Sequence, residues 1–246
     1  MSGSVEQPQQ LPQLLLIVDC ETTGLEPPAA ELCEVGAVLF SISQRAVVMQ
    51  LSFLRPVLEN SAEAINGIDP GLTQLPQPAA EAWQLFLAMV RQADAFLAHN
   101  AAFDRGWIEP LLPAELRAAR PWICSCEAIR WNGLRTNPSL QTLALAHGIP
   151  VWAAHRALTD CTYLAQVLER DPELEAHLAE GLLPRRLVVA DVAYSQRELA
   201  KEAGFRWIPA ARQWQRRCSE AEIAELPFPC IAVDPDPRPV DDHQRP

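Results

Sequence analysis

A run of apolar residues that ends in two carboxylates, residues 14–25 (LLLIVDCETTGL), most constrains the fold of this chain. Residues 14–18 are apolar without alternation, which predicts a strand buried on both faces in the middle of a sheet. Because side chains in a strand repeat every two residues, Asp19 and Glu21 should project from one face, where they repel each other unless a cation lies between them. The stretch therefore indicates a site for a hard divalent metal. The alternative is a pair of solvated acids at a strand end. Residues elsewhere in the chain are needed to distinguish a metal site from such a pair.

The pattern of apolar residues downstream predicts an α/β fold, a mixed sheet flanked by helices. Two β-rich stretches, residues 31–43 and 46–54, should pair antiparallel with the first strand, and residues 95–98 form a further short strand. Helices are predicted over residues 79–92, 101–112, 139–147 and 157–170. The buried face of the first of these helices is expected to carry Ala82, Leu85, Phe86, Met89 and Val90.

Two more acids lie where predicted elements begin. Asp104 closes the sequence HNAAFD, one turn into the helix that follows the short strand, and Asp160 lies five residues after His155 at the start of the last helix. Ligands of α/β folds gather at such a sheet edge, so the four acids can converge there. A two-metal phosphodiesterase site needs acids that hold ions roughly 3.5 to 4 Å apart. Histidine can serve as the base, because it titrates near neutral pH.

These motifs resemble those of the DEDDh 3′-5′ exonucleases, the group that contains bacterial proofreading subunits, RNase T and exodeoxyribonuclease X. Asp-x-Glu-Thr-Thr-Gly, His-Asn-Ala-x-Phe-Asp and a histidine five residues before an aspartate occur intact and in order between residue 14 and about residue 170. Arg156 stands where the sister group carries tyrosine, which favours the histidine subgroup. Asn66 stands where many members have histidine. Cys124 and Cys126 lack the second pair that a zinc site needs, and we interpret them as core residues.

The resemblance implies an RNase H-like fold and assigns roles to particular residues. Two divalent metal ions, Mg²⁺ or Mn²⁺, would be bound by Asp19, Glu21, Asp104 and Asp160, with His155 as the general base. Substrate contacts would come from Thr22, Thr23, Leu25, Asn100 and Phe103. For two of these residues a structural role is the alternative to substrate contact: Phe103 could be a core residue of its helix, and Leu25 could simply fill a turn. His99 and Asn100 are expected to brace the site more than to touch substrate.

The resulting hypothesis is a metal-dependent 3′-5′ exonuclease that acts on single-stranded 3′ ends and releases nucleoside 5′-monophosphates. DNA is favoured over RNA as its substrate. One alternative is an exoribonuclease that trims RNA, because nothing in the sequence reads a 2′-hydroxyl. Another is a catalytically silent polymerase-accessory or nucleic-acid-binding protein, although all five reactive positions are present. A cytoplasmic location is expected, since seven scattered cysteines suit a reducing compartment and no apolar stretch approaches a membrane span. The oligomeric state is left open, a homodimer included.

Charge is distributed unevenly along the chain. The net charge is −11, yet residues 181–218 carry 3 acids and 8 bases and are therefore basic. We predict four regions: a flexible leader over residues 1–13, an exonuclease domain over 14–172, a small α+β domain over 184–233 and a disordered acidic tail over 234–246.

The small domain resembles the one that follows the nuclease in exodeoxyribonuclease X-like proteins. A strand (LVVADV) should be followed by helices that open with capping boxes at Ser195 and Ser219. Between the helices, residues 204–217 (GFRWIPAARQWQRR) predict a hairpin. Its four arginines, expected to contact nucleic acid as a clamp, are Arg206, Arg212, Arg216 and Arg217. Of its aromatic residues Phe205, Trp207 and Trp214, two should lie in the core.

Overall fold

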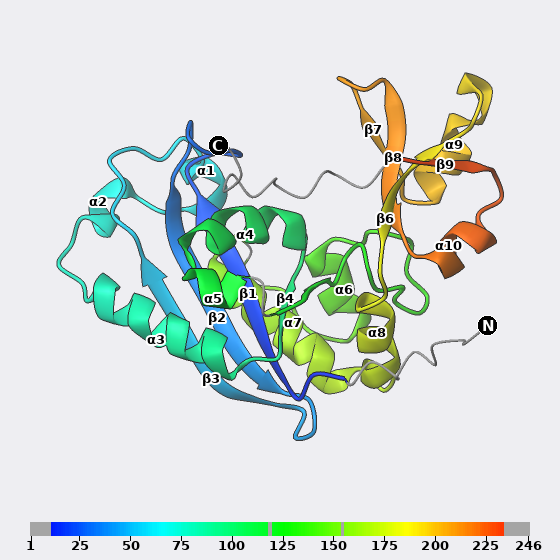
Figure 1. Cartoon of the computed structure of the whole chain (residues 1–246). Helices are drawn as coiled ribbons and strands as arrows, with labels where there is room; N and C mark the ends of the chain where they lie inside the picture. Colours follow the sequence, from blue (N-terminus) through cyan, green and yellow to red (C-terminus); the bar gives the residue numbers. More distant parts are fainter. Residues whose placement is uncertain (1–10, 118–119, 154, 234–246) are drawn as a thin grey trace, which may run out of the picture. The chain divides into compact units, whose positions relative to one another are not determined.

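A computed structural model describes residues 11–117, 120–153 and 155–233 (Figure 1). Most of the predicted leader and all of the predicted acidic tail lie outside the described residues. The chain divides into two compact units, residues 1–134 with 138–182 and residues 135–137 with 183–246. None of the helices in the described part of the chain is long and apolar enough to span a membrane.

A five-stranded mixed sheet forms the first unit, in the order β3-β2-β1-β4-β5 (Figure 1). β1 pairs antiparallel with β2 and parallel with β4, so it lies in the middle of the sheet. β2 in turn pairs antiparallel with β3, which confirms the predicted meander. The strands are β1 (Leu14–Thr22), β2 (Leu32–Ser41), β3 (Ala46–Leu54), β4 (Ala95–Ala98) and β5 (Trp122–Cys124).

Helices cover both faces of this sheet, and alternate residues of β1 belong to two different cores. Leu15 and Ile17 pack with residues of α6, α7 and α8, whereas Leu16 and Val18 pack with residues of α3 and α4. Burial on both sides explains why this strand is apolar without alternation. The helices are α1 (Glu63–Asn66), α2 (Pro70–Thr73), α3 (Ala79–Gln92), α4 (Ala101–Ile108), the 3-10 helix η1 (Glu109–Leu111), α5 (Ala114–Arg117), α6 (Leu140–Ala146), α7 (Ala157–Arg170) and α8 (Leu174–Gly181).

Two details of the helices differ from the sequence prediction. The helix after β4 ends at Ile108 and continues as a 3-10 turn, because Pro110 has no N–H for an α-helical hydrogen bond. On α3, Leu85 is 40% exposed and Leu87 is buried instead. The buried stripe of that helix is therefore rotated by part of a turn from the predicted one.

The second unit is a four-stranded antiparallel sheet in the order β7-β8-β6-β9. Its small core contains Val188, Ala190 and Cys218 from the strands, together with Ala200 and Ile223 from two helices. Both helices therefore pack on the same face of the sheet. The elements are β6 (Arg186–Ala190), the 3-10 helix η2 (Tyr194–Gln196), α9 (Arg197–Glu202), β7 (Arg206–Ile208), β8 (Gln213–Cys218), α10 (Glu220–Glu225) and β9 (Cys230–Ala232).

The predicted hairpin of this unit is confirmed as β7 and β8, and one of the two predicted capping boxes is confirmed. At the start of α10, the Ser219 N–H donates to Glu222 Oε2 (2.8 Å) and the Glu222 N–H donates to Ser219 Oγ (3.3 Å). The box predicted at Ser195 is wrong. That residue lies inside the 3-10 turn η2, so α9 begins only at Arg197.

Candidate active site

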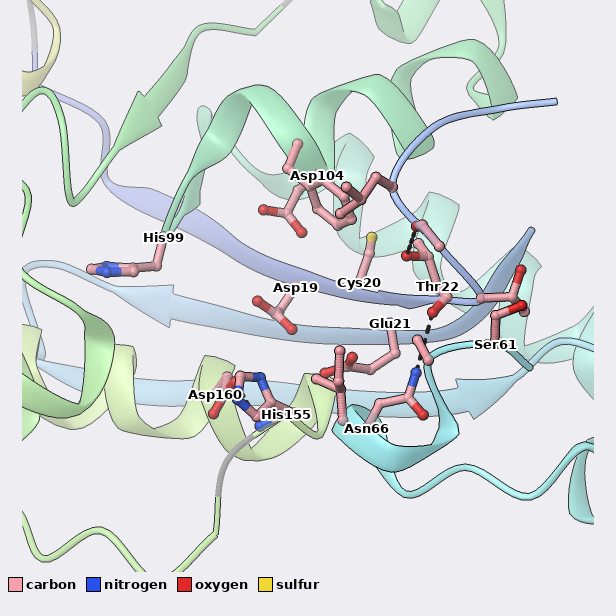
Figure 2. A pocket seen from close by; sticks show the side chains of 16 residues that line it. Asp19, Cys20, Glu21, Thr22, Ser61, Asn66, His99, Asp104, His155 and Asp160 are labelled. Carbon is pink, nitrogen blue, oxygen red and sulfur yellow. Dashed lines mark hydrogen bonds between the residues drawn. The ribbon is translucent and has the colours of Figure 1, made fainter. Parts of the chain in front are cut away.

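The end of β1 brings two acids close to a third from α7. Asp19 and Glu21 both lie within the strand, paired with Gly36 and Glu34 of β2. One carboxylate oxygen from each of Asp19, Glu21 and Asp160 lies within 4.8 Å of the other two. Figure 2 shows these side chains directed toward a common space. Three of the four predicted ligands therefore form one cluster.

The fourth predicted ligand, Asp104 of α4, lines the same pocket as this cluster (Figure 2). The pocket has a volume of about 480 Å³. Asp104 is only 2% exposed, and its Oδ1 has no hydrogen-bond partner within the described part of the chain. The Oδ1 atom of Asp160 is also buried and lacks a partner among the described residues. Because a buried acceptor without a donor is costly, both atoms fit the role of ligands to a cation.

Burial raises the pKa values of all four carboxyl groups, and repulsion from other acids of the site adds to this effect for Asp19 and Glu21. Burial comes first for Asp19, whose pKa is raised well above its ordinary value, and the charges of Asp104 and Asp160 add to it. Burial and the charge of Asp160 raise the pKa of Glu21 to about 8. The pKa values of Asp104 and Asp160 are raised mainly by burial. An all-oxygen donor set whose charges repel fits a hard divalent cation.

His155 lies on the turn that precedes α7, and hydrogen bonds hold this turn on its upstream side. Its backbone has φ of 60°, a conformation that is uncommon for a residue other than glycine, and its N–H donates to Asp160 Oδ2 (3.2 Å). The buried hydroxyl of Tyr163 accepts from the N–H groups of Trp152 (3.1 Å) and Ala153 (3.2 Å) and donates to the Ala153 carbonyl (2.9 Å). The surroundings therefore fix the backbone that carries His155.

Downstream of His155, a buried acid of β2 fixes the start of α7. Glu34, with a side chain only 3% exposed, accepts from Arg156 Nε (3.1 Å), Arg156 Nη2 (3.0 Å) and the Ala157 N–H (3.2 Å). Ser52 Oγ donates to the same carboxylate (3.0 Å). Sequence reasoning missed Glu34. The signal was available, since an acid inside the apolar strand ELCEVGAVLF is seldom buried without a partner.

Two exposed apolar side chains also line the pocket. Leu25, after the end of β1, is 82% exposed, and Ile65 of α1 is 65% exposed. Asn66 Nδ2 donates to the Thr22 carbonyl (3.2 Å) and so ties α1 to the end of β1 (Figure 2). Ile65 was not singled out from the sequence, because one apolar residue in a loop carries no periodic signal.

The two threonines after the acids shape the turn that they begin. Thr22 Oγ1 donates to the Gly24 carbonyl (2.6 Å), and Thr23 Oγ1 accepts from the Glu31 N–H (2.9 Å). Both threonines line the pocket, as does Phe103, which also packs against Trp107 with ring centroids 6.2 Å apart. Asn100, by contrast, is not among the residues that line the pocket. It precedes α4 and has a φ of 82°.

The Cys-Ser-Cys segment, interpreted from the sequence as core, lies beside the site. Ser125 Oγ is 2.9 Å from Nδ1 of His99, which lines the pocket. Cys124 Sγ accepts from the Ala101 N–H (3.4 Å), at the first residue of the helix that carries Asp104. Burial lowers the pKa of His99 to about 4, so this histidine is neutral near pH 7. His99 therefore braces this side of the pocket.

Among the arginines predicted to contact nucleic acid, Arg216 requires a correction. Its side chain is 9% exposed, and Nη2 forms an ion pair with Glu222 Oε1 at 2.6 Å while Nη1 donates to the Ala203 carbonyl (3.0 Å). This guanidinium is therefore a structural part of the second unit. The other three arginines, Arg206, Arg212 and Arg217, are exposed.

The prediction that two of the three aromatics lie in the core is confirmed. Phe205 is buried in the core of the second unit and Trp214 packs against that core, whereas Trp207 is 46% exposed.

Comparison with known proteins decides the family. Residues 16–168 match the family model RNase_T, which is described as Exonuclease. The chain belongs to this exonuclease family. The three motifs that resemble those of DEDDh-type 3′-5′ exonucleases all lie within the matched residues. Members of the family generally use divalent metals, in agreement with the acidic cluster described above.

Other similarities cover parts of the exonuclease. Residues 186–233 match a family described as a domain of unknown function, DUF8626. The DNA polymerase III PolC-type of Thermotoga petrophila is 29% identical over 165 residues, which are 65% of this chain and 12% of the polymerase. The same values hold for the PolC-type polymerase of Thermotoga maritima. The chain thus spans only a small part of the length of these polymerases.

Solved structures of several exonucleases are similar to parts of this chain. E. coli Exonuclease I in complex with a dT13 oligonucleotide has a TM-score of 0.54 and 18% identity over 77% of this chain and 50% of that chain. A 3′-exonuclease that recognises a histone mRNA stem-loop has a TM-score of 0.53 and 13% identity over 72% of this chain and 87% of that chain. Exonuclease X in complex with 5′ overhanging duplex DNA has a TM-score of 0.49 and 26% identity over 67% of this chain and 99% of that chain. The predicted RNase H-like mixed sheet with flanking helices is confirmed, as is the small additional domain.

Proposed function

We propose that the exonuclease removes nucleotides from single-stranded 3′ ends, with DNA as its substrate, and releases nucleoside 5′-monophosphates. The observation that carries this proposal is the cluster of carboxylate oxygens from Asp19, Glu21 and Asp160, within 4.8 Å of one another. Asp104, buried in the same pocket, and the adjacent His155 complete the set. The preference for DNA rests on the polymerase relatives, of which the chain matches only a segment.

The four acids are assigned as ligands for two divalent cations, Mg²⁺ or Mn²⁺. Oxygen donors suit both ions. When bound, the cations supply positive charge that offsets the carboxylates and stabilises the negative charge of the transition state. The carboxylates of this chain contribute by holding that charge at the end of β1, beside the pocket that admits the substrate.

His155 is assigned as the general base. It accepts a proton from the attacking water while the water oxygen bonds to the terminal phosphorus. The bond from phosphorus to the 3′ oxygen of the preceding nucleotide breaks, and that oxygen takes up a proton. The products are a nucleoside 5′-monophosphate and a strand with a new 3′-hydroxyl. The hydrogen bond from the His155 N–H to Asp160 Oδ2 supports this role, since it ties the base to a ligand.

The apolar residues of the pocket are assigned to the terminal nucleotide. Leu25, Ile65 and Phe103 offer apolar surface on which a base can pack without regard to its identity. Thr22 and Thr23 fix the turn that carries Leu25, so we expect them to act on substrate position through the backbone. Asn100 is expected to act in the same indirect way, through the start of α4.

Digestion of matched DNA and RNA single strands tests the function. Strands labelled at the 5′ end, incubated with Mg²⁺, Mn²⁺ or EDTA, should shorten stepwise from the 3′ end in the presence of metal and stay intact in EDTA. The Asp19→Asn variant serves as the inactive control. Faster digestion of RNA would replace DNA by RNA as the substrate, and no digestion of either would favour a silent binding protein. The cytoplasmic location stays a prediction.

A further inference from the structure

Two cysteines at the end of β5 have their side chains in contact. Cys124 Sγ and Cys126 Sγ are 3.6 Å apart, within hydrogen-bond distance for sulfur. The Ala128 N–H donates to the Cys124 carbonyl (2.9 Å), so residues 124–128 form one turn of helical type. Cα atoms two residues apart in such a turn are separated by about 5.4 Å, a distance that a disulfide can bridge. The pair therefore has the backbone geometry and the sulfur contact that a disulfide requires.

The residue between the two cysteines is buried and anchored at three groups. The Ser125 N–H donates to the Ala98 carbonyl (2.9 Å), and the Ser125 carbonyl accepts from Trp131 Nε1 (2.7 Å). Ser125 Oγ lies 2.9 Å from His99 Nδ1. These contacts fix the turn and keep the two sulfur atoms adjacent. A movement of one sulfur toward the other therefore has to come from the cysteine side chains.

The surroundings of Cys124 favour its thiolate form. Hydrogen bonds from the Cys126 thiol and from the Ala101 N–H (3.4 Å) lower the pKa of Cys124 to about 6, against the effect of its burial. Cys124 is also partly exposed, whereas Cys126 is buried. The thiolate is the reactive form of cysteine, so Cys124 is the residue that an oxidant meets first. Burial instead raises the pKa values of Cys20, Cys33, Cys161 and Cys218.

A metal ion is a poorer occupant of this pair than a disulfide. A structural zinc site needs four ligands. Among the described residues, the side chains close enough to share an ion are those of Asp19, Glu21 and Asp160, and neither cysteine belongs to that group. His99, the histidine next to this turn, has Nδ1 at 2.9 Å from Ser125 Oγ and Nε2 at 3.0 Å from the Pro138 carbonyl. Both of its ring nitrogens are therefore engaged.

We propose that Cys124 and Cys126 are a redox modification site, at which hydrogen peroxide closes a reversible disulfide that slows the exonuclease. The Cys124 thiolate attacks one peroxide oxygen, so an S–O bond forms, the O–O bond breaks, and the leaving hydroxide takes up a proton to give water. Cys126 then attacks Cys124 Sγ. The S–S bond forms, the S–O bond breaks, and the hydroxide leaves with the proton of Cys126 as a second water. Two thiols are oxidised and the peroxide is reduced to two waters.

The helix α4 connects this site to the active site. Ala101 is the first residue of α4, and Asp104 follows on the same helix. The first N–H groups of a helix have no partner within it, and Cys124 Sγ accepts from the N–H of Ala101. Closure of the disulfide draws the sulfur atoms together and replaces a charged acceptor by a neutral one. The start of α4 then loses this acceptor and Asp104 is displaced, which is where the effect on rate rests on the proposed function.

Mass spectrometry of the full chain after treatment with hydrogen peroxide tests the disulfide. Cys124 and Cys126 lie on one tryptic peptide without a further cysteine. This peptide should lose two hydrogens and resist alkylation until dithiothreitol is added. After removal of the peroxide by catalase, the rate of cleavage of a short strand with Mg²⁺ should be lowered about 10-fold or more and should return with dithiothreitol, since small misplacements at a site cost up to about 10².

Two variants show whether the disulfide is the cause of the lower rate. Cys126→Ser cannot form it, so the peptide should gain one oxygen at Cys124 and the enzyme should keep most of its rate. Cys230→Ser is the matched control, because Cys230 is also partly exposed but lies in the second unit. This variant should respond to peroxide as the unmodified enzyme does.

Three results would overturn the proposal: cysteines that are still alkylated after peroxide, a disulfide that leaves the rate unchanged, or an equal loss of rate in Cys126→Ser. An enzyme that is inactive before treatment would refute the proposed function instead. The mass of the peptide would still decide whether the disulfide forms, because that measurement does not depend on activity.

Discussion

At the scale of single residues, the carboxyl groups of the site make the metal-free protein sensitive to pH. Burial and Asp160 raise the pKa of Glu21 from its ordinary 4.5 to about 8. Between these values the folded protein holds a proton that the unfolded chain has released. The protonated Glu21 therefore stabilises the folded protein fully at pH values below its pKa in the unfolded chain. This contribution to the free energy of unfolding is lost as the pH rises through the pKa of Glu21 in the folded protein. The raised pKa values of Asp19, Asp104 and Asp160 act in the same direction.

We therefore expect the melting temperature in EDTA to fall as pH rises from about 5 to about 8, and this can be followed by circular dichroism. Glu21→Gln, which cannot ionise, should make the dependence shallower. Addition of Mg²⁺ should restore most of the loss at the higher pH, because the cation binds the charged form. A melting temperature in EDTA that rises over the same range would contradict the repulsion described here.

His155 is assigned as a base and not as a ligand, and the two roles predict different losses. His155→Ala should lower kcat by about 10²- to 10⁴-fold, with little change in the affinity for Mn²⁺ measured by calorimetry. His147→Ala is the matched control, because that histidine caps α6 and does not line the pocket. If metal affinity fell as far as kcat, His155 would have to be counted among the ligands.

Glu34 should act on the reaction through Arg156 and Ala157, as a positioning residue. Glu34→Gln keeps the size of the side chain but removes the charge that holds Arg156, so the turn that carries His155 loosens. We expect kcat to fall by about 10-fold or more, since small misplacements at a site cost up to about 10². The KM of a short strand and the metal affinity should change much less.

Ser52→Ala is the control for Glu34, because Ser52 binds the same carboxylate and leaves the contacts to Arg156 and Ala157 in place. Rate measurements on the three proteins with one short strand decide the outcome. The positioning role would be refuted if Ser52→Ala and Glu34→Gln lowered kcat equally.

At the scale of elements, the site depends on the close packing of α7 on β2. A Cβ added at Gly36 would lie 2.4 Å from the carbonyl carbon of Ala157, which is backbone and cannot move without shifting the helix. Gly36→Ala should therefore destabilise the protein by about 1 to 3 kcal/mol and displace Asp160, with loss of activity.

Gly106→Ala on α4 is the matched control for Gly36→Ala. A Cβ at Gly106 would meet nothing within 4 Å, and alanine favours a helix over glycine by about 1 kcal/mol, so this variant should be stabilised. Urea unfolding of both variants, together with their cleavage rates, gives the comparison. A Gly36→Ala variant as stable as the unmodified protein would mean that the helix can move at little cost.

The elements also show what the sequence could predict. The strand of Asp19, the helices α3 and α7 and the hairpin β7–β8 followed from periodicity and from turn residues, which are local signals. The partners of buried charges did not. Glu34 and Arg156 lie 122 residues apart in sequence, and Arg216 meets Glu222 only because α10 folds back onto the sheet. Which face of a strand is covered depends on such distant segments, so Arg216 could not be told from Arg217.

For the whole molecule, the two units have separate hydrophobic cores. The cores on the two faces of the first sheet share no residue with the core around Val188, Phe205 and Cys218. The candidate metal ligands all belong to the first unit. A bound cation should therefore stabilise one unit directly and leave the other unchanged, provided that each unit unfolds as a body of its own.

Scanning calorimetry should accordingly resolve two transitions, of which Mg²⁺ raises only one. At a concentration of 100 times the Kd, the cation contributes about 2.7 kcal/mol to the folded unit, which corresponds to a shift of roughly 5 to 10 °C. Asp19→Asn should abolish that shift. Phe205→Ala should lower only the other transition, because it leaves a cavity in the core of the second unit at a cost of about 3 to 5 kcal/mol. A single transition that moves as a whole with both changes would mean that the units fold as one cooperative body.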